Sequence, residues 1–150
     1  MVSDGCRFDG ASGKPNVISV LSPGAVVEIG GGSYLNGASI LASDRVEVGE
    51  GCVLGGCTIT DSDFHPLDAD SRLAGVPGKV APVTIGNRCW IGTDVVVLKG
   101  VVVGDEAVAG AGTILRRPVP ARSVVIGDPQ QVVAEVSSFA PSTEGNGSRR

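Results

Sequence analysis

The only histidine of this 150-residue chain, His65, lies among three carboxylates, Asp61, Asp63 and Asp68. An imidazole that titrates near neutral pH can take a proton from a hydroxyl or amine, and a nearby carboxylate can orient it and raise its basicity. We therefore predict His65 as a general base that one of these three aspartates orients, and Asp63 is a further candidate catalytic residue. Taken alone the pattern is also compatible with an ordinary surface histidine.

The only tryptophan, Trp90, is the second residue that could take part in chemistry. It precedes Ile91, which falls on an interior position of the repeat described below. Since neighbouring side chains of a strand point to opposite faces, Trp90 is expected on the outside of the molecule. An exposed tryptophan indicates contact with a ligand or another subunit, unless a loop covers it.

The elements that carry these residues follow from a six-residue repeat. Aliphatic or small residues recur every six positions, with one single-residue insertion, and we expect them to point inward: Ile29, Leu35, Leu41, Val48, Leu54, Thr60, Ile85, Ile91, Val97, Val103, Ala109 and Leu115. The residue two positions earlier is small or β-branched, and a glycine often follows. This pattern predicts short strands joined by tight turns, three to a coil of 18 residues.

The predicted fold is therefore all-β, a solenoid whose coils stack at strand spacing. Aromatic residues make up only 3% of the chain, against 42% hydrophobic residues and 23 glycines, which favours a narrow interior. A valine-rich β-sandwich is the alternative, but it has no reason to keep a six-residue register. We expect residues 1–16 to cap the solenoid, residues 17–135 to form it, residues 61–80 to leave it as a loop, and residues 136–150 to be a disordered tail.

Composition also restricts the possible functions. The net charge of −4 argues against a nucleic-acid partner, and the sequence contains neither a membrane-spanning apolar run nor a signal peptide, so a cytoplasmic location is expected. The four cysteines have no zinc-site spacing and are expected to be free thiols. With a single histidine, no metal site is predicted, and a zinc-dependent carbonic anhydrase is disfavoured.

Four segments together resemble the hexapeptide-repeat acyltransferases, most of all the sugar O-acetyltransferases of the maltose, galactoside and nodulation type. They are the repeat itself, the loop DSDFHPLD, the segment PVTIGNRCWIG and the run VGDEAVAGAGTILRRPVPARSVVIGDPQQVV. The resemblance covers about residues 20–135. It implies a left-handed parallel β-helix that forms a homotrimer, with active sites between subunits and acetyl-CoA in the groove between neighbouring helices.

The resemblance also implies roles for individual residues. His65 matches the catalytic histidine that deprotonates the acceptor hydroxyl, and Asn36 lies near the active-site asparagine. The other matches concern coenzyme A, including two arginines that could bind its phosphates: Trp90, Thr93, Gly110, Ala111, Arg116 and Arg117. Backbone amides of the glycine-rich stretch could stabilise an oxyanion, and Lys99 is a further candidate cation.

The predicted function is acetyl transfer from acetyl-CoA to a hydroxyl of a sugar or a similar small acceptor. Two alternatives remain: N-acetylation of an amino sugar or antibiotic, and a non-catalytic binding solenoid. The chain departs from the family after Gly127-Asp128-Pro129, where Gln130 and Gln131 replace the usual basic residue. It also lacks the N-terminal helical region of the maltose-type enzymes.

Overall fold

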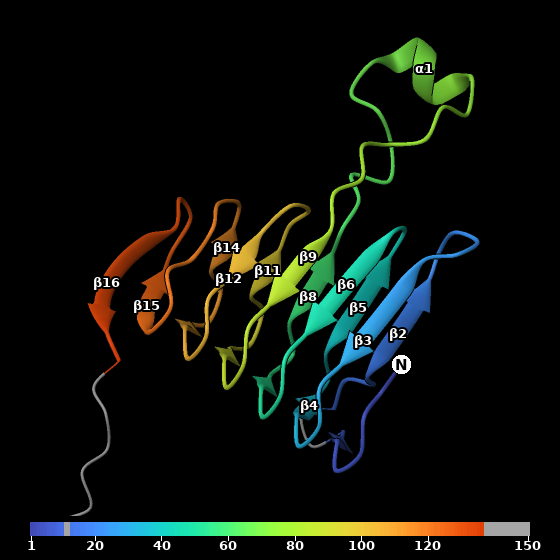
Figure 1. Cartoon of the computed structure of the whole chain (residues 1–150). Helices are drawn as coiled ribbons and strands as arrows, with labels where there is room; N and C mark the ends of the chain where they lie inside the picture. The colour runs from blue at the N-terminus through green and yellow to red at the C-terminus, as the bar shows by residue number, and fades with distance from the viewer. Residues whose placement is uncertain (11–12, 137–150) are drawn as a thin grey trace, which may run out of the picture.

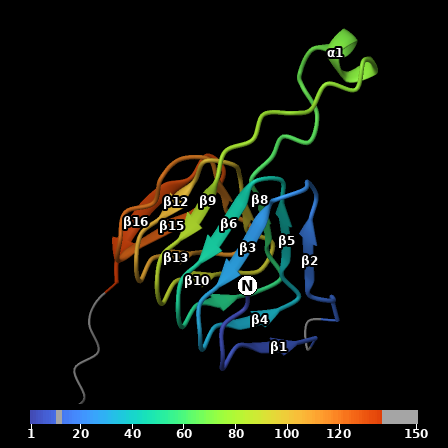
Figure 2. The ribbon, with the colours of Figure 1, turned by 45° about the vertical axis from the view of Figure 1, so that its right-hand side comes forward.

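The computed structural model describes residues 1–10 and 13–136. Its strands form three sheets that make the walls of a prism, and the chain winds around this prism coil by coil (Figures 1 and 2). Neighbouring strands pair in parallel except for the last two, β15 and β16, which are antiparallel. Parallel pairing between residues 18 positions apart, such as Trp90 and Val108, matches the predicted coil and excludes the β-sandwich.

The three sheets are numbered by the order in which a coil visits them. Sheet 1 contains β1 (Arg7–Asp9), β4 (Tyr34–Asn36), β7 (Val53–Leu54), β10 (Trp90–Ile91), β13 (Val108–Ala109), β15 (Ser123–Ile126) and β16 (Gln131–Glu135). Sheet 2 contains β2 (Val17–Val20), β5 (Ser39–Ala42), β8 (Thr58–Thr60), β11 (Val96–Val97) and β14 (Ile114–Leu115). Sheet 3 contains β3 (Val26–Ile29), β6 (Arg45–Val48), β9 (Val83–Ile85) and β12 (Val102–Val103).

Three rows of turns join these sheets, and each row is one edge of the prism. The Thr93 corner joins sheet 1 to sheet 2 through residues 37–38, 55–57, 92–95 and 110–113. The loop corner joins sheet 2 to sheet 3 through residues 43–44, 61–82, 98–101 and 116–118. The Arg88 corner returns from sheet 3 to sheet 1 through residues 30–33, 49–52, 86–89 and 104–107.

The segment from residue 61 to residue 82 is far longer than the other turns of the loop corner and projects from the body (Figure 1). We call it the arm; it carries the one helix of the described residues, α1 (Ala69–Leu73). At the N-terminal end, β1 pairs with β4 and extends sheet 1. Of the predicted tail, residues 137–150 lie outside the described residues. No helix in the described part of the chain is long and apolar enough to cross a membrane.

The interior is narrow, as the low aromatic content predicts. Its largest fully buried side chains are isoleucines, leucines and valines. None of the four aromatic residues that the structure describes is buried: Phe8, Phe64 and Trp90 are about half exposed, and Tyr34 is partly covered. The outward orientation predicted for Trp90 is confirmed, with 56% of its surface exposed.

The predicted inward register is wrong in two strands of sheet 2. Ile40 and Ile59 point into the core, in place of the predicted Leu41 and Thr60. Leu41 is only partly covered, whereas Thr60 is buried beside the loop corner. A one-residue slip reverses the face of every side chain in a strand.

The cause is a shorter turn at the Thr93 corner. The amide of Cys57 donates to the carbonyl of Gly55, two residues back, at 2.6 Å. The equivalent turn of the next coil is one residue longer, because the amide of Val95 donates to Gly92, three residues back. A three-residue turn of this kind uses one residue fewer, so the strand that follows begins one residue earlier and its register shifts.

Glycines along the Arg88 corner let the coils stack closely. Gly30, Gly49, Gly86 and Gly104 follow the inward aliphatic residues, and a Cβ atom at each would lie 2.4–2.6 Å from an atom of the next coil. At Gly49 the Cβ would meet the carbonyl oxygen of Gly86 at 2.6 Å. The repeated glycine of the sequence thus marks the points where one backbone touches the next.

Replacement of Gly49 by Ala is expected to lower the free energy of unfolding by about 1–3 kcal/mol, the usual range for overpacking, because its contact is with rigid backbone. Urea unfolding at fixed protein concentration measures this loss. Gly10→Ala is the matched control, since a Cβ at Gly10 would have no atom within 4 Å. Equal midpoints for the two variants would contradict the proposed close contact.

Candidate active site

His65 lies on the arm, just beyond the point where the arm leaves the body. Its backbone amide donates to the carbonyl of Asp63 at 2.7 Å, and its side chain is exposed. Among the described residues the imidazole has no hydrogen-bond or ion-pair partner. Asp68 caps the short helix that follows by accepting from the amide of Ser71, and this hydrogen bond lowers the pKa of Asp68.

The carboxylate of Asp63 contacts a lysine of the next coil. Lys99 Nζ lies 2.6 Å from Asp63 Oδ1, and both side chains are about one third exposed. This ion pair therefore links the arm to the next turn of the loop corner within one chain. The sequence predicted Asp63 as a catalytic residue, and that role remains a prediction.

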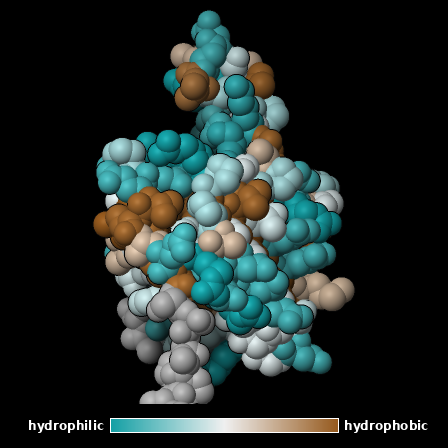
Figure 3. Space-filling model, turned by 60° about the vertical axis from the view of Figure 1, so that its left-hand side comes forward, coloured by the Kyte–Doolittle hydropathy of each residue, from teal (hydrophilic) through white to brown (hydrophobic). Residues whose placement is uncertain are grey.

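A cavity of about 490 Å³ lies beneath the arm. It is lined by Asp63, Pro66, Leu67, Asp68, Pro77, Lys79 and Lys99. The arm also exposes large apolar side chains, with Leu67 95% and Leu73 89% accessible. Figure 3 shows separate brown side chains among hydrophilic ones on the projecting arm.

The second group of predicted residues lies on sheet 1 and the Thr93 corner. Asn36 ends β4 and Trp90 begins β10, whereas Thr93, Gly110 and Ala111 lie in successive turns of the corner. These turns stack directly, since the amide of Gly112 donates to the carbonyl of Thr93 at 2.9 Å. Most side chains in these turns are small, but Asp94 projects from the turn of Thr93 and pairs with Lys14 at 2.9 Å.

Trp90 is part of an apolar column on the outer face of sheet 1. Strand register aligns Tyr34, Val53, Trp90, Val108 and Val124 across five neighbouring strands. The outer face of sheet 3, in contrast, carries Glu28, Glu47, Thr84 and Val102 in register. The apolar column of sheet 1 thus has no counterpart on sheet 3.

Arg116 and Arg117 follow β14 at the loop corner, and the next segment holds them in place. The side-chain oxygen of Gln130 accepts from both backbone amides, at 2.7 and 2.9 Å. Arg116 also pairs with Asp128 at 3.3 Å, and a cavity of about 280 Å³ opens between the arginines, Pro129 and Gln130. In the sequence Gln130 stands out only because it replaces a basic residue. A six-residue pattern cannot predict its hydrogen bonds to the two arginine amides.

The predicted residues therefore divide between two edges of the prism. His65, Asp63, Arg116 and Arg117 lie at the loop corner, whereas Asn36, Trp90, Thr93, Gly110 and Ala111 lie on sheet 1 or at the Thr93 corner. Sheet 2 separates the two edges, and a four-residue strand such as β5 spans roughly 13 Å. Proton transfer needs heavy atoms about 3 Å apart. One chain does not bring the two groups together.

The four cysteines are free thiols, as predicted, and three are buried. Cys52 and Cys89 lie on adjacent coils, and their Sγ atoms donate to the backbone carbonyls of Gly86 and Gly104, at 3.1 and 3.2 Å. Burial raises the pKa of Cys57 to about 12. Buried thiols are poor nucleophiles, so these residues belong to the core and not to the candidate site.

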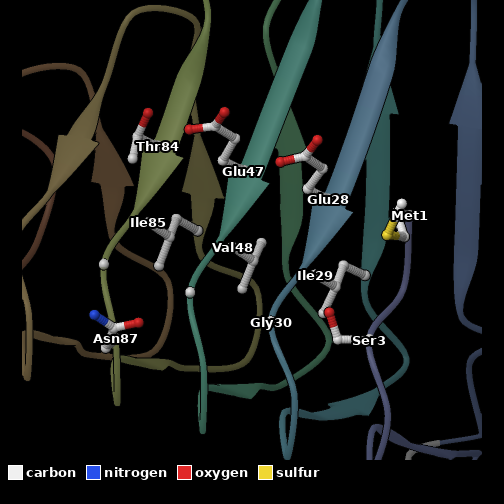
Figure 4. A pocket seen from close by; sticks show the side chains of 12 residues that line it. Met1, Ser3, Glu28, Ile29, Gly30, Glu47, Val48, Thr84, Ile85 and Asn87 are labelled. Carbon is white, nitrogen blue, oxygen red and sulfur yellow. The ribbon is translucent and has the colours of Figure 1, made fainter.

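A larger groove, of about 510 Å³, runs across sheet 3 beside the Arg88 corner (Figure 4). Glu28 and Glu47 project from neighbouring strands on the same side as Thr84, and Asn87 lies at the other end. Arg45 pairs with both carboxylates, which reduces the negative charge of this face. None of the predicted site residues lines this groove.

Comparisons with known proteins show relatives of this chain in sequence and in fold. Residues 82–117 match the family model described as the hexapeptide repeat of succinyl-transferase. The galactoside O-acetyltransferase of Escherichia coli K12 is 32% identical over 117 residues, which cover 77% of this chain and 57% of that protein. A predicted acetyltransferase of Staphylococcus aureus is 37% identical over 78 residues, which cover 52% of this chain and 39% of that protein.

A solved galactoside acetyltransferase in complex with coenzyme A superposes with a TM-score of 0.71 at 29% identity, over 89% of this chain and 66% of that one. The matches confirm the predicted fold, a left-handed parallel β-helix of hexapeptide repeats with an extruded loop. The chain belongs to the hexapeptide-repeat acetyltransferase family. It spans about two fifths to three fifths of the length of the two curated relatives described here.

Replacement of Asp63 by Asn and of Lys99 by Met should each lower the free energy of unfolding by at most about 1 kcal/mol, because the ion pair is partly exposed. Since the two groups are partners, the double variant should be no less stable than the weaker single variant. Urea unfolding of the four proteins forms the double-mutant cycle. Additive losses would show that the two charges act independently.

Proposed function

We propose that this protein transfers an acetyl group from acetyl-CoA to a hydroxyl of a small sugar-like acceptor, at sites formed between two copies of the chain. The observation that carries the proposal is the division of the candidate residues between two edges of one prism. If the loop corner of one copy faces the Thr93 corner of the next, His65 and Trp90 can line one crevice. Galactoside acetyltransferase, a relative with the same fold, binds coenzyme A.

A homotrimer satisfies this arrangement with the fewest assumptions. The two edges that meet are different surfaces, so the contact is heterologous, and such contacts form a closed ring when the rotation allows it. Three copies around a threefold axis would form three equivalent crevices. The exposed apolar column on sheet 1 and the exposed leucines of the arm are surfaces that this assembly could cover.

The chemistry follows from the residue types on each side of the crevice. His65 would take the proton of the acceptor hydroxyl as its oxygen attacks the thioester carbonyl. Backbone amides of the Gly110-Ala111 stretch could donate to the oxyanion of the tetrahedral intermediate. Collapse of that intermediate breaks the carbon–sulfur bond, and the imidazolium returns the proton to the departing thiolate. The products are the acetyl ester and coenzyme A.

The nucleotide end of acetyl-CoA needs positive charge. Arg116 and Arg117 stand at the loop corner with their backbone fixed by Gln130, so their side chains can reach phosphate groups without reordering the turn. The pantetheine arm is flexible and uncharged, and it suits the small residues at the Thr93 corner. We infer that Thr93 and Ala111 contact it and that Trp90 lies beside it.

His65→Ala is expected to lower kcat by about 10²–10⁴ while leaving the KM for acetyl-CoA nearly unchanged, because the base does not bind the thioester. A steady-state assay that follows release of the CoA thiol, with sugar alcohols and amines compared as acceptors, measures both constants. Asp70→Ala, on α1 of the same arm, is the control and should keep full turnover. Wild-type turnover in His65→Ala would remove the proposed base.

Mixed assemblies test whether two chains form each site. Ala111→Trp should block the pantetheine path, and Ala111 is exposed, so the fold should tolerate the change. Trimers assembled from His65→Ala and Ala111→Trp chains contain one crevice with both wild-type halves. They should regain about one third of wild-type turnover if the ring is closed and heterologous.

Trimers of His65→Ala chains that differ only in their affinity tags serve as the control for assembly and should regain nothing. A site built within one chain predicts no recovery in either mixture. Absence of recovery, with both parent variants assembled normally, would therefore overturn the intersubunit site.

A further inference from the structure

The arm starts at a buried carboxylate that the proposed chemistry does not use. Asp61 is fully buried, and its two oxygens accept hydrogen bonds from three successive backbone amides of the preceding coil. Oδ1 accepts from Ser43 at 2.7 Å, and Oδ2 accepts from Asp44 at 2.7 Å and from Arg45 at 2.8 Å. These amides form the short turn of the loop corner directly before the arm.

The backbone of Asp61 also fixes the point where the arm returns. Its carbonyl accepts from the amide of Ala81 at 2.9 Å, and Ser62 and Val80 form an antiparallel bridge. The amide of Asp63 then donates to the carbonyl of Lys79 at 2.9 Å. A short two-stranded stem thus runs outward from the buried anchor.

His65 lies directly at the outer end of this stem. Phe64 before it adopts a left-handed backbone conformation, with φ of 61°, and turns the chain. On the returning strand, a Cβ at Gly78 would lie 2.7 Å from the amide nitrogen of His65, so the two strands touch at the histidine. The backbone of His65 is therefore placed by a ladder whose inner end is Asp61.

We propose that Asp61 is a positioning residue for His65. This positioning role rests on the proposed function only for its predicted effect on turnover. A carboxylate that accepts three amide hydrogen bonds forms strong, charge-assisted contacts, and its loss leaves buried donors without partners. The stem then loses its attachment to the coil below, and the ion pair between Asp63 and Lys99 remains as its side-chain tie to the coil above.

The chain contains a second carboxylate that bridges adjacent coils. Asp105 Oδ1 accepts from the amide of Asn87 at 2.7 Å, but Asp105 is exposed, accepts from one backbone amide instead of three, and lies at the Arg88 corner, where no arm leaves. A purely structural role of Asp61 predicts a lower free energy of unfolding in Asp61→Asn without a change in the arm. A positioning role predicts that Asp61→Asn, and not Asp105→Asn, alters the arm and the turnover.

The experiment compares the isosteric Asp61→Asn, the shorter Asp61→Ser and Asp105→Asn with wild type. In tag-free protein His65 is the only histidine, so its imidazole NMR signals report on one residue. In Asp61→Asn we expect shifted or broadened imidazole signals and at least tenfold faster hydrogen exchange at the amides of Asp63 and Ala81. Asn keeps one acceptor oxygen in a side chain of the same shape, whereas Ser is too short to reach the three amides, so Asp61→Ser should show larger changes of the same kind.

In the same variants kcat should fall about 10–100-fold for Asp61→Asn, because a misplacement of about 1 Å can cost that much. The KM for acetyl-CoA should stay within about twofold, since the proposed pantetheine contacts lie at the Thr93 corner. Asp105→Asn should change neither the arm nor kcat. Wild-type exchange and imidazole signals in Asp61→Asn, or an equal loss of kcat in Asp105→Asn, would overturn the positioning role.

The NMR and exchange measurements need no substrate. If wild type lacks acetyl transfer, the proposed function fails, but these two measurements still decide whether Asp61 positions the arm.

Discussion

The fixed spacing between parallel strands of adjacent coils determines the rest of this structure. Each coil must repeat the path of the one before it within hydrogen-bonding distance, so interior residues, turns and glycines all recur in register. The Arg88 corner shows how strict the constraint is, because added Cβ atoms at Gly30, Gly49, Gly86 and Gly104 would meet the next coil at 2.4–2.6 Å. The same spacing brings the amides of residues 43–45 within reach of Asp61.

Sequence periodicity predicted most of the fold because this constraint appears directly in the chain. The stacking of Trp90 on Val108, the burial of Cys52 and Cys89, and the outward tryptophan all follow from counting in steps of six. The six-residue count was wrong at Leu41 and Thr60 because the turns before these strands, residues 37–38 and 55–57, are shorter than the turn of residues 92–95. A hydrogen bond from Cys57 to Gly55 closes the shorter turn before Thr60.

The candidate site was predictable in its residue types but not in its contacts. His65 is identified by being unique and by lying outside the repeat, and Trp90 by its parity within a strand. The partners of the nearby carboxylates are remote in sequence: Asp63 meets Lys99, 36 residues on, and Asp61 meets backbone amides 16–18 residues earlier. Backbone amides carry no sequence signal, so the anchoring of Asp61 could be found only from the structure.

A narrow interior also explains why function should lie at the edges of this fold. The core is filled by aliphatic side chains that are fully covered, and a cofactor-sized cavity between the sheets would break the contact between coils. The largest side chain, Trp90, is accordingly outside. Chemistry must then use side chains that project from corners and walls, where solvent reaches them from one side. A second copy of the chain can enclose such residues without changing the register of either prism. A β-helix can therefore form an enclosed active site by assembly, whereas a deeper pocket within one chain would disrupt the stacking of its coils.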